Sequence, residues 1–355
     1  MYIKLFFLFN LFLLSGNSYS QIASSSLFPE IKSFNPAVIG QRQKGAVSVI
    51  GQMDKIEKEQ DISPTYGSGA KGTSKIDINA FSFFYGGKGG GLVTSEFTYV
   101  GATGKKVDKL QSSQSTVEGS NDVSQSYTNL GLGIGKYLGL SAALLSFDYA
   151  TKMSGNFGGA PFNSDLKQES DGTILKAGFH FNAGADFGFY YEQTDASFDI
   201  TESGVTTSTK QTYKRVGLGV GASSKNFHFE ISHEKDLDDN VVDGKTYKPT
   251  RTTAALEGRF GKISLGYIGS YYVDGLVDLE ELLYFNLVYS KTIDEARLEN
   301  IFNFSYGSDK GHSFSGSVGF SEVKSQEISA LYGNGPKYDT TTTQTTYAIK
   351  YSYIF

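Results

Sequence analysis

The 355-residue chain contains no cysteine and no tryptophan, and it has only 6 prolines. The absence of cysteine excludes disulfides, thiolate metal sites, cysteine nucleophiles and the acylated cysteine of a lipoprotein. The scarcity of proline leaves nearly every backbone N–H available for the hydrogen bonds of a sheet. A net charge of -5 provides no basic surface, so we expect no nucleic acid among the partners.

Long apolar runs are also missing after residue 20, where no stretch approaches the roughly 18 residues that a membrane-spanning helix requires. The N-terminus differs, because Lys4 precedes an apolar run over residues 5–14 and Ser18-Tyr19-Ser20 resembles a cleavage site. We therefore interpret residues 1–20 as a secretory signal peptide, with an uncleaved anchor helix as the alternative. Cleavage would leave residues 21–44 as a periplasmic or plug segment.

Aromatic residues and glycine are abundant, with 27 Phe, 23 Tyr and 42 Gly. Past residue 44 apolar and polar residues alternate with a period of two, which is typical of strands. The pattern is clearest over residues 347–355, where aromatic and aliphatic side chains share one face and Lys350 and Ser352 share the other. A strand face of this kind at the end of a chain requires an apolar medium outside it. Lipid is the natural medium, and strands cross lipid only as closed barrels.

We distinguish sixteen candidate strands, joined alternately by tight turns and by long links rich in Ser, Thr, Gly, Asn and Asp. The long links include residues 55–74, 102–124 and 151–172. The link over residues 307–311 is unexpectedly short, and losing one hairpin there gives fourteen strands. The sequence therefore predicts an all-β fold, a transmembrane antiparallel barrel of 14–16 strands over residues 45–355. It would lie in the bacterial outer membrane with both termini in the periplasm. A soluble sandwich is the alternative.

The polar strand faces predict a water-accessible lumen with ionisable walls. Charges there could orient solutes or could pair across strands and stiffen the wall, and both readings remain open. No hydrolase or metalloprotease motif is present, so we expect neither an enzyme nor a cofactor. The acidic run over residues 236–244 begins like a calcium loop but does not continue as one, and we expect no metal site. The lumen-wall candidates are Glu96, Asp148, Lys176, His180, Arg215, His228, Glu230, Glu257, Arg259 and Lys350.

The most specific local signal is Asn35-Pro36-Ala37, which stands a few polar residues before the first strand. It resembles the FadL family of outer-membrane channels for fatty acids and hydrocarbons, in which an N-terminal plug ends in an Asn-Pro-Ala turn. The resemblance implies a plug near Phe28, Phe34 and the Asn35–Ala37 turn. It also implies capture of a ligand at the outer face and sideways release through the wall, gated by this segment.

These observations predict an outer-membrane channel for passive uptake of small hydrophobic solutes that resemble fatty acids or hydrocarbons. The alternatives are a general diffusion porin for small polar solutes and a non-conducting barrel with a structural or adhesive role. The expected partners are outer-membrane lipid, lipopolysaccharide, the barrel assembly machinery and the solute. Tyr351, Tyr353 and the terminal Phe355 resemble the assembly signal of such barrels.

Overall fold

The computed structural model describes residues 35–355 with several internal gaps. The signal peptide, Phe28 and Phe34 therefore lie outside the described residues. The gaps are residues 43, 62–68, 112–115, 158–159, 203–204, 225, 239, 243–244, 248, 274–280, 283–288, 308–310 and 330–336.

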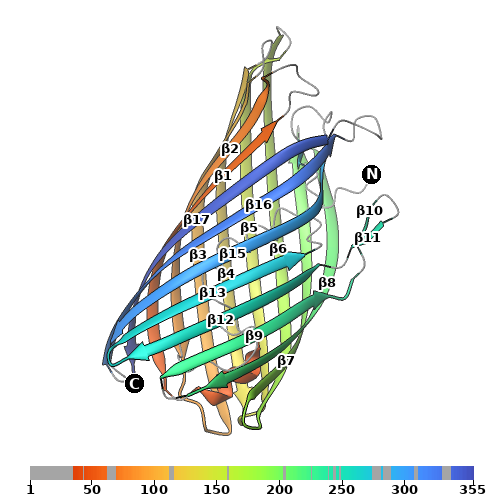
Figure 1. Ribbon diagram of the computed structural model, residues 1–355. Helices are drawn as coiled ribbons and strands as arrows, with labels where there is room; N and C mark the ends of the chain where they lie inside the picture. The colour runs from red at the N-terminus through yellow and green to blue at the C-terminus, as the bar shows by residue number, and fades with distance from the viewer. Residues whose placement is uncertain are drawn as a thin grey trace.

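Fourteen antiparallel strands form a closed barrel, which lies at the lower end of the predicted range (Figure 1). Each strand pairs with its neighbours in the chain, β1 pairs with β17, and the β13–β15 pairing joins the two ends of the sheet. The barrel strands are β1 Ala46–Asp61, β2 Lys71–Gly86, β3 Val93–Gln111, β4 Thr116–Ile134, β5 Leu138–Phe157, β6 Ala160–Asn182, β7 Asp186–Glu202, β8 Val205–Ser223, β9 Phe227–Asp236, β12 Thr250–Phe260, β13 Ile263–Val273, β15 Tyr289–Gly307, β16 Gly311–Ser329 and β17 Lys337–Ile354.

Three short strands lie beside this barrel. The strands β10 Asn240–Val242 and β11 Lys245–Tyr247 pair only with each other, and β14 Glu281–Leu282 pairs with the start of β15. A short 3-10 helix, η1 Pro36–Gln41, precedes β1. No helix among the described residues is long and apolar enough to cross a membrane.

Most of the strands are longer than the sequence predicted. The expected links over residues 102–124 and 151–172 are mostly strand, because β3 and β5 continue outward and β4 and β6 begin early. Two of the sixteen candidate strands, expected over residues 312–321 and 325–333, fall within the single strand β16 as far as residue 329. The sequence reading ended each strand where its apolar face ended, whereas the backbone pairing continues through polar residues.

The outer surface changes sharply from apolar to charged along these long strands. On β1 the outward residues Val49 and Met53 are followed by Lys55 and Glu57. Near the end that carries the C-terminus, the exposed side chains are large and hydrophobic. The opposite end carries cross-strand ion pairs, such as Lys75 Nζ to Glu57 at 2.9 Å. Since lipid-spanning barrels bear one apolar band, the long strands project beyond the membrane as a polar collar.

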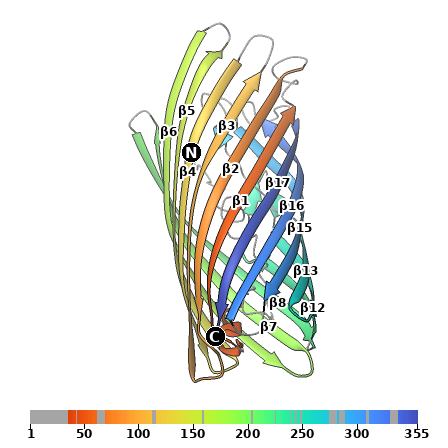
Figure 2. The same cartoon turned by 90° about the vertical axis from the view of Figure 1, so that its left-hand side faces the viewer.

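The wall is lower on one side of the barrel. The strands β9, β12 and β13 have 10, 11 and 11 residues, whereas β6 has 23. As a result β8 pairs with β9 only from Arg215 to Ser223. Figure 2 shows the tall side, where β3 to β6 rise together.

The C-terminal residues close the barrel next to the first strand. The Phe355 N–H donates to the Gly45 carbonyl at 3.0 Å, and the Gly45 N–H donates to the Phe355 carbonyl at 3.1 Å. The Phe355 ring stacks on Tyr85 with centroids 6.4 Å apart, and Tyr351 packs against Phe314. Tyr353 is 48% exposed on the outer face. The predicted orientation of this strand is confirmed, and its role in assembly stays a prediction.

Candidate functional site

The Asn-Pro-Ala turn begins η1 inside the barrel, at the end that holds the C-terminus (Figures 1 and 2). The Asn35 side chain caps the helix by accepting a hydrogen bond from the Ala37 N–H at 3.0 Å. Its Nδ2 donates to the Phe179 carbonyl on β6 at 2.8 Å. Pro36 occupies the first helical position, where its fixed φ fits and no N–H is needed. The turn is therefore tied both to its own helix and to the wall.

The wall beside η1 is made of glycines whose missing side chains make room for it. A Cβ on Gly139 of β5 would overlap the backbone of Pro36 and Ala37. A Cβ on Gly178 of β6 would overlap the Asn35 side chain, and one on Gly133 of β4 would overlap Gly40. Only glycine permits so close an approach. We call Gly133, Gly139 and Gly178 the glycine seat. The sequence reading missed it, although glycine at alternate positions of β4 was a visible signal.

Two polar side chains at the end of η1 strengthen the attachment. The Arg42 guanidinium forms an ion pair with Glu96 of β3 and lies 5.1 Å from the centre of the Phe84 ring. Gln41 donates through Nε2 to the Lys136 carbonyl at 2.7 Å. Glu96 was predicted as part of the lumen wall, and the structure shows that its partner is Arg42, which directly follows η1. Neither Gln41 nor Arg42 was singled out from the sequence.

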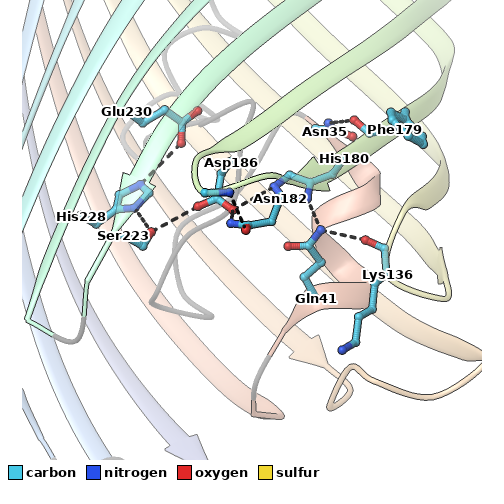
Figure 3. A network of polar contacts seen from close by, with 11 residues as sticks. Asn35, Gln41, Lys136, Phe179, His180, Asn182, Asp186, Ser223, His228 and Glu230 are labelled. Carbon is cyan, nitrogen blue, oxygen red and sulfur yellow. Dashed lines mark hydrogen bonds and ion pairs between the residues drawn. The ribbon is translucent and has the colours of Figure 1, made fainter.

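A chain of polar contacts starts at Gln41 and runs along the lumen wall (Figure 3). Gln41 Nε2 faces Nδ1 of His180 on β6, and His180 Nε2 lies 3.7 Å from a carboxylate oxygen of Asp186 on β7. Asn182 Nδ2 donates to the same Asp186 oxygen at 2.7 Å. His180 is fully buried. The structure therefore brings a predicted lumen residue into contact with η1.

The chain of polar contacts continues across β8 and β9. Ser223 Oγ lies 3.4 Å from the second Asp186 oxygen and 2.8 Å from Nδ1 of His228. His228 Nε2 lies 3.5 Å from Glu230 Oε2, and both of these side chains are buried (Figure 3). Ser223 and Asp186 were missed by sequence reasoning, because a serine and an aspartate at strand ends resemble ordinary turn residues.

Ion pairs line the inner wall from the tall strand β6 to the low strand β12. Lys176 Nζ lies 2.7 Å from Glu192, and Arg215 Nε lies 2.6 Å from Asp236. Arg251 Nε donates to Glu234 at 2.8 Å. These six residues form what we call the ion-pair ladder, which crosses β6, β7, β8, β9 and β12. Of the two readings of the lumen charges, pairing across strands is observed for Lys176 and Arg215, and action on solutes stays a prediction.

The other lumen-wall candidates divide between the two faces. Glu257 and Lys350 lie on the inner face, and Arg259 lies near the turn after β12, where its Nε donates to the Gly261 carbonyl at 3.4 Å. The assignment of Asp148 to the lumen is wrong, because it is exposed on the outer face of the collar. Its neighbours Phe147 and Tyr149 are buried on the inner face, whereas the sequence reading expected aromatic side chains to face lipid.

Those buried aromatic residues belong to an apolar area on the inner face of β1 to β7. Sequence reasoning missed this area because it assumed a polar lumen. We call it the apolar inner sector. Its larger members are Ile56, Ile76, Ile78, Val123, Leu145, Phe147, Tyr149 and Ile174.

The described part of the chain contains no group of three or more His, Asp or Glu side chains placed to hold a metal ion. The residues at the site can therefore bind through apolar contact, hydrogen bonds and paired charges.

Comparisons with known proteins support the fold. No family model and no curated protein matches the chain. Among solved structures, the P. putida toluene transporter TodX aligns over 96% of this chain and 98% of its own, with a TM-score of 0.60 and 10% identity. A Pseudomonas aeruginosa FadL homologue aligns over 90% and 92%, with a TM-score of 0.57 and 10% identity. The CymD monoaromatic hydrocarbon channel aligns over 94% of both chains, with a TM-score of 0.50 and 11% identity. The chain thus shares the barrel fold of FadL-type outer-membrane channels, as the sequence resemblance predicted.

Proposed function

We propose that this protein is an outer-membrane channel for the passive uptake of small hydrophobic solutes. The observation that carries the proposal is the combination of η1 in the glycine seat with an apolar inner sector on β1 to β7. We take η1 to be the plug that the family resemblance implies. The solved structures of similar fold include a toluene transporter and a monoaromatic hydrocarbon channel, which supports the same class of solute.

The inner wall favours a hydrophobic solute over a freely diffusing polar one. Apolar surface buried against the inner sector stabilises a bound solute by roughly 25 cal/mol for each Å² removed from water. The ion-pair ladder has three cations and three anions, so it presents balanced charge to the lumen. Ligand sites commonly combine an apolar wall with a few fixed polar groups in this way.

The seated plug determines how the solute leaves. Since η1 occupies the lumen at the end that carries the C-terminus, straight passage requires that the plug move or that the solute leave through the wall. Sideways release is the route implied by the family resemblance, and capture at the outer face fits the collar that projects beyond the lipid belt. The proposed partners are the lipid around the belt, the lipopolysaccharide around the collar, and the machinery that assembles outer-membrane barrels.

Paired valine substitutions test the role of the apolar inner sector. Val123 is 4% exposed on the inner face of β4, whereas Val107 is 39% exposed on the outer face of β3. We expect Val123→Asn to lower toluene uptake into proteoliposomes several-fold, because an amide there makes the inner wall polar. Val107→Asn should leave uptake unchanged. Equal uptake by the two variants, or faster permeation of a small sugar than of toluene through the unaltered protein, would contradict the proposal.

A further inference from the structure

We propose that the polar chain from Gln41 to Glu230 is a proton-sensitive latch that holds the plug in its seat at neutral pH and loosens it in acid. The inference rests on the proposed role of η1 as a plug. The latch joins η1 to four strands, because its members come from β6, β7, β8 and β9 (Figure 3).

The contacts of Gln41 fix which ring nitrogen of neutral His180 carries the proton. The Lys136 carbonyl can only accept a hydrogen bond, so the Gln41 amide must present its NH₂ group there, at 2.7 Å. The same NH₂ group faces His180 Nδ1. That nitrogen must then accept, and neutral His180 carries its proton on Nε2, toward Asp186 at 3.7 Å.

Protonation of His180 reverses this arrangement. A doubly protonated ring points an Nδ1–H at the Gln41 NH₂ group, so two donors meet. Turning the amide would aim its oxygen at the Lys136 carbonyl and would lose that hydrogen bond as well. Meanwhile the charged ring is attracted to Asp186, on the side away from the plug. Acid therefore removes contacts of η1 and strengthens contacts within the wall.

Among the described residues, His180 faces one carboxylate, which is that of Asp186 of β7. η1 presents the neutral Gln41, and the turn between β4 and β5 presents the Lys136 carbonyl. The nearby Arg42 is paired with Glu96.

The second histidine, His228, faces Glu230 on its own strand. It also lies opposite Glu257 of β12 in the pairing and bonds to Ser223 of β8. These carboxylates belong to the wall and not to η1.

The absence of cysteine permits a direct measurement of plug seating. A nitroxide on Val38→Cys, in the middle of η1, reports the mobility of the helix in the assembled protein. One buried hydrogen bond contributes about 1 kcal/mol, so protonation of His180 should raise the ratio of released to seated plug about fivefold. Because His180 is buried, the titration runs from about pH 7.5 down to about pH 4. The mobile component of the spectrum measures this ratio.

Two variants and one control make the test specific. His180→Gln keeps an acceptor for Gln41 but does not titrate, so the spectrum of the label should be that of the seated helix at both pH values. Gln41→Leu removes the amide, so the label should be mobile at both pH values. His233→Gln changes an exposed histidine on the outer face and should retain the full response. A spectrum of the otherwise unaltered labelled protein that does not change with pH would overturn the latch, as would an undiminished response in His180→Gln.

Toluene uptake in the same samples separates the latch from the proposed function. A label that becomes mobile in acid while uptake stays constant would support the latch and reject the gating role of the plug. Absence of uptake at both pH values with an intact spectral response would reject the channel and leave the latch standing.

Discussion

The glycine seat makes a strong prediction, that one methyl group in the barrel wall displaces the plug. Gly139→Ala places a Cβ on the backbone atoms of Pro36 and Ala37. Because these are backbone atoms, no side-chain rotation relieves the overlap, and η1 must shift as a unit. The shift would also break the hydrogen bond from Asn35 to the Phe179 carbonyl.

The size of the effect follows from the steric overlap and from the lost hydrogen bond. Overpacking a filled site costs about 1–3 kcal/mol. The lost hydrogen bond from Asn35 adds about 1 kcal/mol. Together they disfavour the seated plug by about 2–4 kcal/mol, which changes the ratio of released to seated plug roughly 30-fold to several-hundred-fold.

The assay compares Gly139→Ala with Gly51→Ala, which makes the same change on the outer face of β1. A Cβ on Gly51 would meet nothing within 4 Å, so that variant should behave as the unaltered protein. Liposome swelling by a small sugar measures leak through the lumen, and the nitroxide at Val38→Cys measures seating. We expect Gly139→Ala to raise both the leak of sugar and the mobility of the label. The reasoning would be refuted if Gly139→Ala folded normally and matched Gly51→Ala in leak and in plug mobility.

Two further predictions concern the wall. Arg251→Leu leaves the buried Glu234 without its cation and should lower the free energy of unfolding by about 3 kcal/mol in urea titrations. Combining Arg251→Leu with Glu234→Leu should recover most of this loss, and an additive result would show that the pair is not coupled. Phe355→Ala removes the ring that stacks on Tyr85 and should lower the fraction of heat-modifiable barrel in outer membranes. A normal yield would argue against the terminal signal.

The sequence predicted the barrel because alternation on a lipid-facing strand is a local property. Each lipid-facing side chain meets the same apolar environment, so Ile349 or Phe304 can be assigned to the outer face without knowing its neighbours. The same logic failed in the collar, where both faces of a strand are polar or the apolar face points inward. Asp148 was misplaced for this reason, since Phe147 beside it packs inside the barrel.

The plug could be predicted only in part, because its contacts depend on residues far apart in the chain. The Asn-Pro-Ala turn is a local signal and was recognised from three residues. Its seat requires Gly133, Gly139 and Gly178 from three strands to meet η1 in space. Arg42 and Glu96 are separated by 54 positions, and nothing local distinguishes their pairing from that of other charges. Separation along the chain, not weak propensity, is the reason that these contacts were missed.

The apolar and polar parts of the inner wall share strand β6. The seat lies on β4 to β6, the apolar inner sector covers β1 to β7, and the ion-pair ladder runs from β6 to β12. The proposed latch connects η1 to β6 and extends to β9, which also carries Asp236 and Glu234 of the ladder. Because β6 carries Gly178 of the seat, Lys176 of the ladder and His180 of the proposed latch, we expect a substitution on this strand to affect both the seating of η1 and its response to pH.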